Sequence, residues 1–497
     1  MKILLVYPAF PRTFWSFKYA LKFISKKATH PPLGLLTIAA MLPEQWEKKL
    51  VDMNVERLKD KDLQGVDFVF ISAMSIQLAS VKEVVEKCKR MRIKMVAGGP
   101  LFTGEYQDFH DVDHLVLNEA EITLPLFLAD LKKGCAKHVY TTKQFADIER
   151  TTVPLWSLIK MRRYSSISLQ YSRGCPYNCE FCEISALFGH RVRTKAKDQV
   201  IMELESLYRQ GWRGNVFFVD DNFIGNKKKL KSEVLPAVNE WAKARKHPFR
   251  FGTEASINLS DDEELMQSMV SAGFNSVFVG IETPNEDSLA ECNKLQNKNR
   301  DLVASINKIQ RAGMEVTGGF IVGFDNDPPS IFDRMIEMIQ QSGVVTAMVG
   351  ILNAPRGTRL HQRLETENRL LKNMSGNNTD FSTNFIPKMN YDVLIEGYRR
   401  IIDGIYSPKP YCQRVKRFLK ENMPSQRVHF SSRKRRLHFE NAGAFFKSLW
   451  LLGIKDRART HYWKLFFWSL FRHPQLFPAA ITFTIYGYHF RKVFGIR

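Results

Sequence analysis

Short apolar runs rich in β-branched residues alternate with helix-length amphipathic segments through most of this chain. In the N-terminal part such runs occupy 1–8, 48–55, 65–74, 93–100 and 112–120, and the amphipathic stretch 81–92 lies between the third and fourth. This alternation predicts a parallel, doubly wound sheet, whose ligands bind at the carboxyl ends of the strands. We therefore predict an α/β fold that begins with a Rossmann-like or flavodoxin-like domain over residues 1–150. Gly98 and Gly99 follow the fourth strand, where a backbone without side chains either lets a ligand come close or makes a tight turn.

The same rhythm resumes further along with six new apolar runs, at 165–174, 215–222, 249–259, 276–284, 315–324 and 344–355. Six strands separated by helices predict a partial (β/α)6 barrel over residues 160–385, with its chemistry at the carboxyl ends of the strands. Polar side chains stand at those ends: Asp220, Asp221, Asn222, Glu254, Ser256, Glu282 and Asp325. Each also has a structural explanation, as a helix cap or as a buried acid paired with arginine.

The region 386–497 breaks this rhythm and is predicted to be a basic, aromatic-rich helical domain. The formal net charge of the chain is +22, and residues 401–497 contain 19 Lys or Arg against 4 Asp or Glu. Such a surplus indicates an anionic partner, either a membrane surface or a nucleic acid. The basic run Arg433 to Arg436, with aromatics such as Trp450 and Phe471, favours the membrane; the alternative is a helical cap packed on the barrel. The longest uncharged stretch near the end, His473 to Phe490, contains two prolines, so a spanning helix is not expected.

Seven cysteines are thinly spread, which fits a reducing cytoplasm better than a secreted disulfide framework. Three of them, Cys175, Cys179 and Cys182, have CxxxCxxC spacing just after a predicted strand. Three thiolates on one loop can bind three irons of a 4Fe-4S cluster and leave the fourth iron open to another ligand. The alternatives are free thiols or a structural zinc site completed by a residue such as His190.

This cysteine motif, with Phe181 before its last cysteine, resembles the defining motif of the radical S-adenosylmethionine (SAM) superfamily. The strands behind it resemble the superfamily's SAM-contacting elements: FFVDDN with Asp220, Asp221 and Asn222, GTEASINL with Glu254 and Ser256, VFVGIETP with Glu282, and GGFIVGF. The resemblance covers roughly residues 165–355. It implies a 4Fe-4S cluster on the three cysteines and SAM on the open iron, whose reductive cleavage yields a radical that removes hydrogen from unactivated carbon.

The N-terminal unit resembles the cobalamin-binding domain that precedes this barrel in one branch of the superfamily. The matching segments are 30–42, 69–85, VAGGPLF with Gly98 and Gly99, and VDHLVLNEAE. The DxHxxG element that supplies a histidine to cobalt elsewhere is absent, and SAMSIQL, beginning at Ser72, stands in its place. The resemblance implies cobalamin bound without a protein imidazole on the metal, or a domain kept only as a scaffold.

Residues 184–228 and the closing segment resemble a narrower subgroup with an extra C-terminal domain, which includes hopanoid methylases. The resemblance implies a cobalamin-dependent radical SAM methyltransferase acting on an unactivated carbon, of a lipid such as a hopanoid first and of a tetrapyrrole second. The alternatives are a radical SAM cyclase or oxidoreductase of the same architecture, and an iron-sulfur RNA-modifying enzyme. The expected electron donor is a flavodoxin or ferredoxin, no nucleic-acid partner is expected, and the expected location is cytoplasmic, peripheral at the inner face of the membrane.

Overall fold

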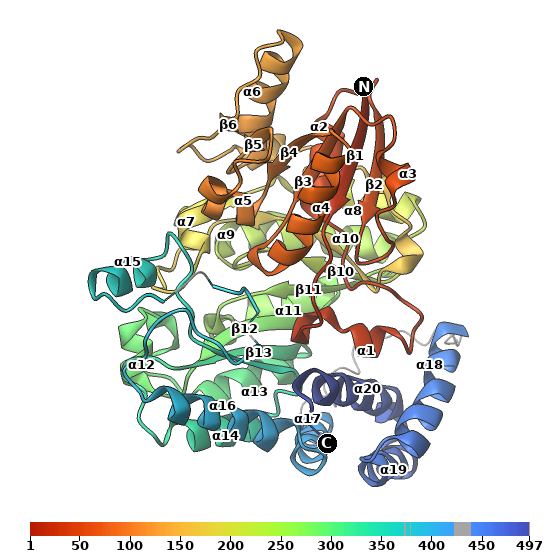
Figure 1. Ribbon diagram of the computed structural model, residues 1–497. Coiled ribbons are helices and arrows are strands. Elements are labelled where there is room, and N and C mark those ends of the chain that lie inside the picture. The colour runs from red at the N-terminus through yellow and green to blue at the C-terminus, as the bar shows by residue number, and fades with distance from the viewer. Residues whose placement is uncertain (372–373, 378, 422–438, 497) are drawn as a thin grey trace.

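A computed structural model describes residues 1–371, 374–377, 379–421 and 439–496. It contains two six-stranded sheets, each with every pairing parallel, and a helical C-terminal region. Figure 1 shows the first sheet and its helices above the second, with the C-terminal helices below. The predicted α/β class is therefore confirmed. The predicted domain limits remain a prediction.

The first sheet has the strand order β2-β1-β3-β4-β5-β6. Its strands are β1 (Lys2–Tyr7), β2 (Glu47–Asp52), β3 (Phe68–Ser72), β4 (Lys94–Gly98), β5 (His114–Val116) and β6 (Val139–Tyr140). Its helices are α2 (Leu33–Met41), α3 (Asp60–Leu63), α4 (Leu78–Arg90), α5 (Pro100–Glu105) and α6 (Ala120–Lys132). Five strands match the predicted runs, whereas β6 is too short for its periodicity to be recognised.

The second sheet has the order β14-β13-β12-β11-β10-β7, so β7 and β14 are its two edges and the barrel is partial. Its strands are β7 (Ser166–Leu169), β10 (Asn215–Phe218), β11 (Arg250–Glu254), β12 (Phe274–Glu282), β13 (Glu315–Val322) and β14 (Ala347–Ile351). Its helices are α8 (Lys197–Arg209), α9 (Lys227–Lys229), α10 (Leu235–Ala244), α11 (Glu263–Ala272), α12 (Glu286–Glu291), α13 (Leu302–Ala312), α14 (Ile331–Ser342) and α15 (Arg359–Thr366). Helices α11 and α13 end at Gly273 and Gly313, whose left-handed backbone suits glycine.

A small antiparallel ribbon of β8 (Ser172–Arg173) and β9 (Arg193–Thr194) stands at the mouth of this barrel. The segment between its two strands carries the CxxxCxxC motif and the short helix α7 (Ile184–Phe188). The ribbon thus fixes both ends of the cysteine loop.

The C-terminal region comprises α16 (Tyr391–Tyr406), α17 (Pro408–Glu421), α18 (Phe439–Trp450), α19 (Arg459–Phe467) and α20 (Phe477–Phe494), with π-helical turns η11 (Leu451–Lys455) and η12 (Trp468–Arg472). Helix α16 packs against α14 of the barrel, and α20 contacts α17 and the short helix α1 (Lys18–Leu21). In Figure 1, α18 and α19 lie at the periphery and α20 lies between them and the barrel. Among the described helices, none is long and apolar enough to cross a bilayer.

Helix α20 joins the two ends of the chain in one core. The ring of Phe490 is fully buried and stacks on Phe14, with centroids 4.4 Å apart, and lies 4.8 Å from the ring of Tyr406. Beside it, Nε2 of His489 lies 2.9 Å from the carbonyl oxygen of Phe14. The final helix is therefore structural, and only the more peripheral aromatics of this region are free for a partner.

This packing predicts that Phe490→Ala lowers the free energy of unfolding by about 3–5 kcal/mol, because it removes a buried ring and leaves a cavity. The matched control Phe471→Ala, whose side chain is 75% exposed, should change it by less than about 0.5 kcal/mol. Urea denaturation followed by circular dichroism measures both. Equal effects of the two substitutions would contradict the assigned core.

Candidate active site

The three motif cysteines lie together on the loop between β8 and α7. Cys179 is buried and Cys175 and Cys182 are partly exposed. Burial raises the pKa of all three thiols, that of Cys182 to about 12, so without a bound metal they stay protonated. The described residues contain no three His, Cys, Asp or Glu side chains close enough to share one metal ion. A cluster does not need that, because each thiolate binds a different iron atom.

The zinc alternative lacks support in the same geometry. Nδ1 of His190 lies 3.2 Å from the carbonyl oxygen of Tyr177, and the residue is exposed. A tetrahedral zinc site would bring four ligands to one ion, and the described residues offer no such group around these cysteines. The donor set that remains is three thiols, which fits a cluster with one open iron.

A buried carboxylate, Asp220, and a partly exposed one, Asp221, hold the backbone that enters the cysteine loop. Asp220 accepts hydrogen bonds from the amides of Tyr171 and Ser172 and from the Ser172 hydroxyl, and Asp221 accepts one of 2.8 Å from the amide of Gly174. Burial raises the pKa of Asp220 to about 7 and that of Asp221 to about 6, although these hydrogen bonds oppose the rise. Both acids come directly after β10, so the end of that strand positions the loop that follows β7.

A chain of amides and hydroxyls runs along one side of the loop. Nδ2 of Asn222 lies 4.0 Å from Sγ of Cys175 and 3.2 Å from Oγ of Ser256. Oγ of Ser256 donates to Oδ1 of Asn258 at 2.7 Å, and Nδ2 of Asn258 donates to the Tyr177 hydroxyl at 2.9 Å. Asn222 and Ser256 are among the residues predicted from the sequence, whereas Asn258 and Tyr177 are not. Their positions inside GTEASINL and the cysteine motif were the available signal.

Glu254 is the candidate best placed to accept a ligand. Its side chain is partly exposed, and in the described structure its carboxylate makes no hydrogen bond or ion pair. Burial and the nearby charges of Asp221 and Asp220 raise the pKa of this carboxyl to about 8. Because this carboxyl has no partner in the described protein and can still be reached, a ligand with hydroxyl or ammonium donors could bind it.

The loop after α12 contacts the opposite side of the cysteine loop. Nδ2 of Asn293 donates to the carbonyl of Asn178 at 2.9 Å, and Nε2 of Gln296 lies 3.9 Å from Sγ of Cys179. Lys294 forms a 2.7 Å ion pair with Glu282, and its charge acts on Cys179 and Cys182. Glu282 is among the residues predicted from the sequence. The loop after α12 is not, because no strand end or motif marks it.

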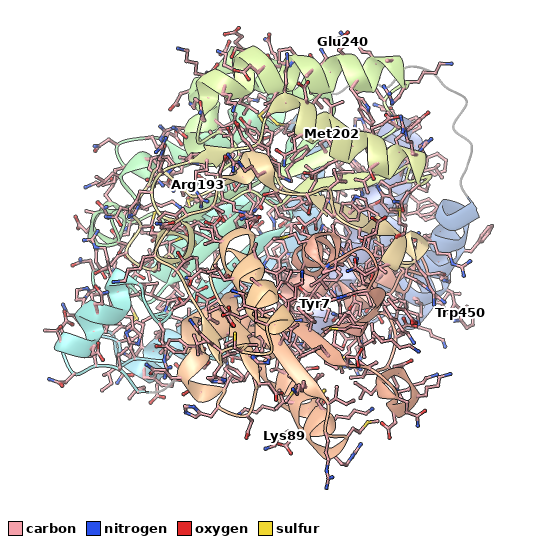
Figure 2. The ribbon with its side chains drawn as sticks, turned by 90° about the horizontal axis from the view of Figure 1, so that it is seen from above. Tyr7, Lys89, Arg193, Met202, Glu240 and Trp450 are labelled. Atoms are coloured by element: carbon pink, nitrogen blue, oxygen red, sulfur yellow. The ribbon has the colours of Figure 1, made fainter. Side chains whose placement is uncertain are left out.

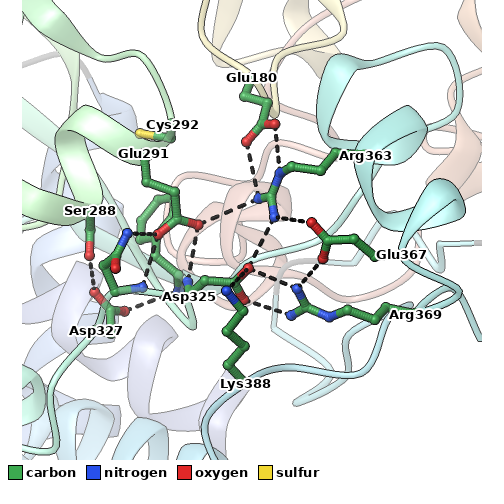
Figure 3. Close-up of polar contacts among 12 residues, drawn as sticks. Glu180, Ser288, Glu291, Cys292, Asp325, Asp327, Arg363, Glu367, Arg369 and Lys388 are labelled. Atoms are coloured by element: carbon green, nitrogen blue, oxygen red, sulfur yellow. Dashed lines mark hydrogen bonds and ion pairs between the residues drawn. The ribbon is translucent and has the colours of Figure 1, made fainter.

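Arg363 of α15 is the centre of an ion-pair network that reaches the motif (Figure 3). Its guanidinium binds the carboxylate of Glu180 in bidentate fashion, at 2.8 and 3.2 Å, and Asp325 at 3.0 Å. Asp325 also pairs with Arg369 at 2.6 Å. Burial alone would raise the pKa of Asp325, but the two arginines lower it to about 2. Asp325 thus anchors the clamp on Glu180, which lies between the second and third cysteines.

Glu119 ties the first sheet to the cysteine loop. Its buried carboxylate, directly before α6, pairs with Arg173 and Arg193 at 2.8 Å each, and Arg173 also pairs with Glu121 at 2.8 Å. Arg173 stands two residues before Cys175. The cysteine loop therefore cannot shift without disturbing the N-terminal sheet.

A cavity of about 460 Å³ opens between the first sheet and the barrel. Its walls include the predicted Ser72, Gly98 and Gly99, the barrel residue Val219, and Arg173. Other apolar side chains line it: Leu33, Ile38, Met41, Phe70, Val96, Leu124 and Phe188. A Cβ on Gly99, whose φ is +90°, would lie 2.6 Å from Oγ of Ser72, so glycine keeps this wall open. No histidine is among the described lining residues.

The predicted residues thus form two groups. Asp220, Asp221, Asn222 and Ser256 surround the cysteine loop, Glu254 lies beside the two aspartates, and Glu282 approaches through Lys294. Ser72, Gly98 and Gly99 line the separate cavity, and Arg173 links the two. Both groups suit the cofactors that the sequence resemblance implies.

Profiles of three protein families match successive parts of the chain. The B12 binding domain matches residues 23–128, the radical SAM superfamily matches 169–339, and a domain of unknown function, DUF4070, matches 358–496. The two named profiles match most of the first sheet, from β2 to β5, and most of the barrel, from β10 to β13.

Individual relatives extend over nearly the whole chain. An uncharacterized methyltransferase of Synechocystis sp. is 38% identical over 99% of this chain and 91% of its own. The hopanoid C-2 methylase of Rhodopseudomonas palustris is 29% identical over 93% of this chain and 88% of its own. The fold is similar to that of the radical SAM methyltransferase TsrM of Kitasatospora setae, solved with cobalamin and a [4Fe-4S] cluster: TM-score 0.58, 16% identity, 76% of this chain and 79% of that one.

We predict that Cys175→Ala, Cys179→Ala and Cys182→Ala each abolish binding of a 4Fe-4S cluster in anaerobically reconstituted protein, because each removes one iron ligand. Iron content and the absorbance of the cluster measure this. Cys88, Cys135, Cys292 and Cys412 should be dispensable.

Cys292 is the sharpest control, because the structure places it beside the motif: its carbonyl accepts from the amide of Glu180 at 2.9 Å, while its thiol faces the carbonyl of Leu289 at 3.7 Å. Loss of the cluster in Cys292→Ala with retention in Cys179→Ala would overturn the assignment.

The Glu282–Lys294 pair predicts opposite shifts of the cluster's reduction potential. A cation near the thiolates stabilises the more negative reduced state, so Lys294→Met should lower the potential by roughly 50–100 mV. Glu282→Gln should raise it, because it removes the opposing charge. Spectroelectrochemical titration monitored by electron paramagnetic resonance measures both, and shifts of the same sign would refute a charge effect.

Proposed function

We propose that this chain, which belongs to the cobalamin-dependent radical SAM methyltransferases, acts on a lipid. The transferred methyl group goes, in this proposal, to an unactivated carbon of a polycyclic isoprenoid lipid such as a hopanoid. A tetrapyrrole is the second candidate.

The chain's own residues divide the work around the cofactors. When bound, the cluster with SAM supplies the radical that removes hydrogen, and cobalamin supplies the methyl group. Cys175, Cys179 and Cys182 would hold the cluster, and Glu254, Asn222 and Ser256 would contact SAM beside it. Ser72, Gly98 and Gly99 would form the wall against cobalamin. The protein then positions these groups and keeps water away from them.

The cavity between the sheet and the barrel is the observation that carries this proposal. It has mostly apolar walls, and one of its few charged members, Arg173, stands two residues before Cys175. A methyl donor held there lies next to the loop on which the radical is generated. Apolar walls favour exclusion of water, which protects reactive radicals from side reactions.

The extent of the similarity favours a lipid over a tetrapyrrole. The hopanoid C-2 methylase matches 93% of this chain. The bacteriochlorophyllide d C-8(2)-methyltransferase of Chlorobaculum tepidum is 25% identical and matches 68% of it. The longer match with the lipid enzyme supports a shared C-terminal region, and with it a shared class of substrate.

A lipid substrate also accounts for where the enzyme would work. We propose that it is cytoplasmic, attaches peripherally to the inner face of the membrane and receives electrons from a flavodoxin or ferredoxin. The basic run Arg433 to Arg436, which first suggested such attachment, lies outside the described residues.

Reconstituted enzyme should add one methyl group to a polycyclic isoprenoid lipid. Holoenzyme is incubated anaerobically with a bacterial lipid extract, a reductant and SAM labelled with deuterium in its methyl group, and the lipids are analysed by mass spectrometry. A hopanoid that gains one labelled methyl is the expected result, and Cys179→Ala is the inactive control.

Other outcomes identify the alternatives. Labelled pigments with unlabelled lipids would transfer the proposal to a tetrapyrrole. A product that gains no carbon would indicate a cyclase or oxidoreductase. Label found in RNA alone, in a parallel incubation with bacterial RNA, would indicate an RNA-modifying enzyme. Each of these results would refute the lipid proposal.

A further inference from the structure

The outer helices of the C-terminal region expose an apolar patch. We define it by six side chains whose exposed fractions lie between 37% and 75%: Phe446, Trp450, Ile454, Phe467, Leu470 and Phe471. They come from α18, η11, α19 and η12 only. Large apolar side chains gathered in this way on one surface usually mark an interaction site.

Helical spacing aligns the members of the patch. Phe446, Trp450 and Ile454 are four residues apart, so they follow one face of the continuous helical segment formed by α18 and η11. Phe467 and Phe471 are also four apart, and their rings stack with centroids 6.0 Å apart.

Trp463 joins these two rows. Its Nε1 donates to the carbonyl of Gly453 at 3.0 Å, and its ring stacks on Phe467 at 5.5 Å. Since Gly453 precedes Ile454, the two helices present one continuous surface. Figure 2 shows Trp450 at the edge of the molecule, pointing away from it.

Cations without acidic partners surround this patch. Lys455, Arg457, Arg459, Lys464 and Arg472 are exposed, and none forms an ion pair with a described residue. The nearby acid, Asp456, is occupied by Arg491.

Two of the surrounding lysines lie over tryptophan rings: Nζ of Lys455 is 5.1 Å from the ring of Trp450, and Nζ of Lys416 is 5.4 Å from that of Trp468. Burial lowers the pKa of Lys416, and the neighbouring positive charges of Lys464 and Arg472 lower it further. Lys416, Lys464 and Arg472 are therefore close enough for their positive charges to act on one another.

We propose that the apolar patch and its cationic rim dock on the surface of an anionic lipid bilayer. Rings at the level of the headgroups with cations beside them are the arrangement that such an interface binds. A protein partner or a second copy of this chain would have to supply a matching acidic rim, whereas anionic lipids supply it at every position. The inference rests on the proposed function in one respect: an enzyme with a lipid substrate would meet that substrate at a membrane.

Point variants test this better than truncation, because α20 belongs to the core. Full-length protein is mixed with vesicles of phosphatidylglycerol and phosphatidylcholine in equal parts, or of phosphatidylcholine alone, and bound protein is separated by flotation. The first variant combines Phe446→Ser, Trp450→Ser and Phe471→Ser. The second combines Lys455→Glu, Lys464→Glu and Arg472→Glu.

Two controls place changes of the same kind on barrel helices, one a single serine substitution and the other a triple charge reversal. Met202→Ser removes a side chain of α8 that is 55% exposed, close to the 52% of Trp450, and lies away from Trp450 in Figure 2. Lys197→Glu with Lys228→Glu and Lys243→Glu changes the net charge as the second variant does, at exposed positions with no ion pair among the described residues.

The intact protein should bind the anionic vesicles at least tenfold more tightly than the neutral ones. Each patch variant should weaken that binding at least tenfold, and the controls should leave it unchanged. Thermal unfolding establishes that each variant is folded, and because the two act on different side chains, a folded second variant is decisive if the first unfolds.

Absence of binding by the intact protein at low salt, or unchanged binding by a folded patch variant, would overturn the inference. So would a dimer that the aromatic substitutions dissociate, or RNA binding that depends on the rim alone. Vesicle binding requires no turnover, so it can fail while the lipid is still methylated in detergent. Docking can equally hold while the methylation proposal fails.

Discussion

The loop that carries Cys175, Cys179 and Cys182 is held from four sides, and the rest of the site depends on this restraint. Asp220 and Asp221 bind the backbone that enters it, Asn222 approaches its first cysteine, the loop after α12 binds its middle, and Arg363 binds Glu180 inside it. A loop of this length without secondary structure would otherwise fluctuate among many conformations. Because three thiols must meet a rigid cluster, their pre-organisation decides whether the barrel can bind one.

Several of the residues that restrain the cysteine loop are charged and largely buried. They fix the position of the loop more than they raise the free energy of unfolding. Removing Glu119, Arg173 or Arg193 from water costs several kcal/mol per group, and the ion pairs between them contribute a favourable free energy of about the same size. Replacing such a network with apolar residues often leaves a protein as stable. The network instead fixes relative position, because Glu119 holds the strand ends of the first sheet next to the cysteine loop. With a methyl donor in one domain and a radical in the other, the relative position of the two domains must be fixed closely.

The C-terminal region shows how one composition can serve two purposes. Aromatic residues of α20 fill the core with Phe14 and Tyr406, while those of α18 to η12 remain at the surface among cations. The difference is geometric, because α20 lies between the barrel and the outer helices. Of the two interpretations of this basic, aromatic tail, packing on the barrel describes α20, and the proposed docking on an anionic surface concerns the outer helices.

The sequence by itself determined the strand and helix order, the cysteine motif and the residues at the strand ends, because periodicity and local spacing are encoded over a few residues. It could not locate Asn258, Lys294, Gln296 or Arg363 beside the motif, since these contacts join positions 81 to 183 residues apart. Likewise Phe471 and Phe490 look alike in the sequence. Only the tertiary structure decided which ring is buried, because burial depends on what packs against a helix face as well as on the residue itself.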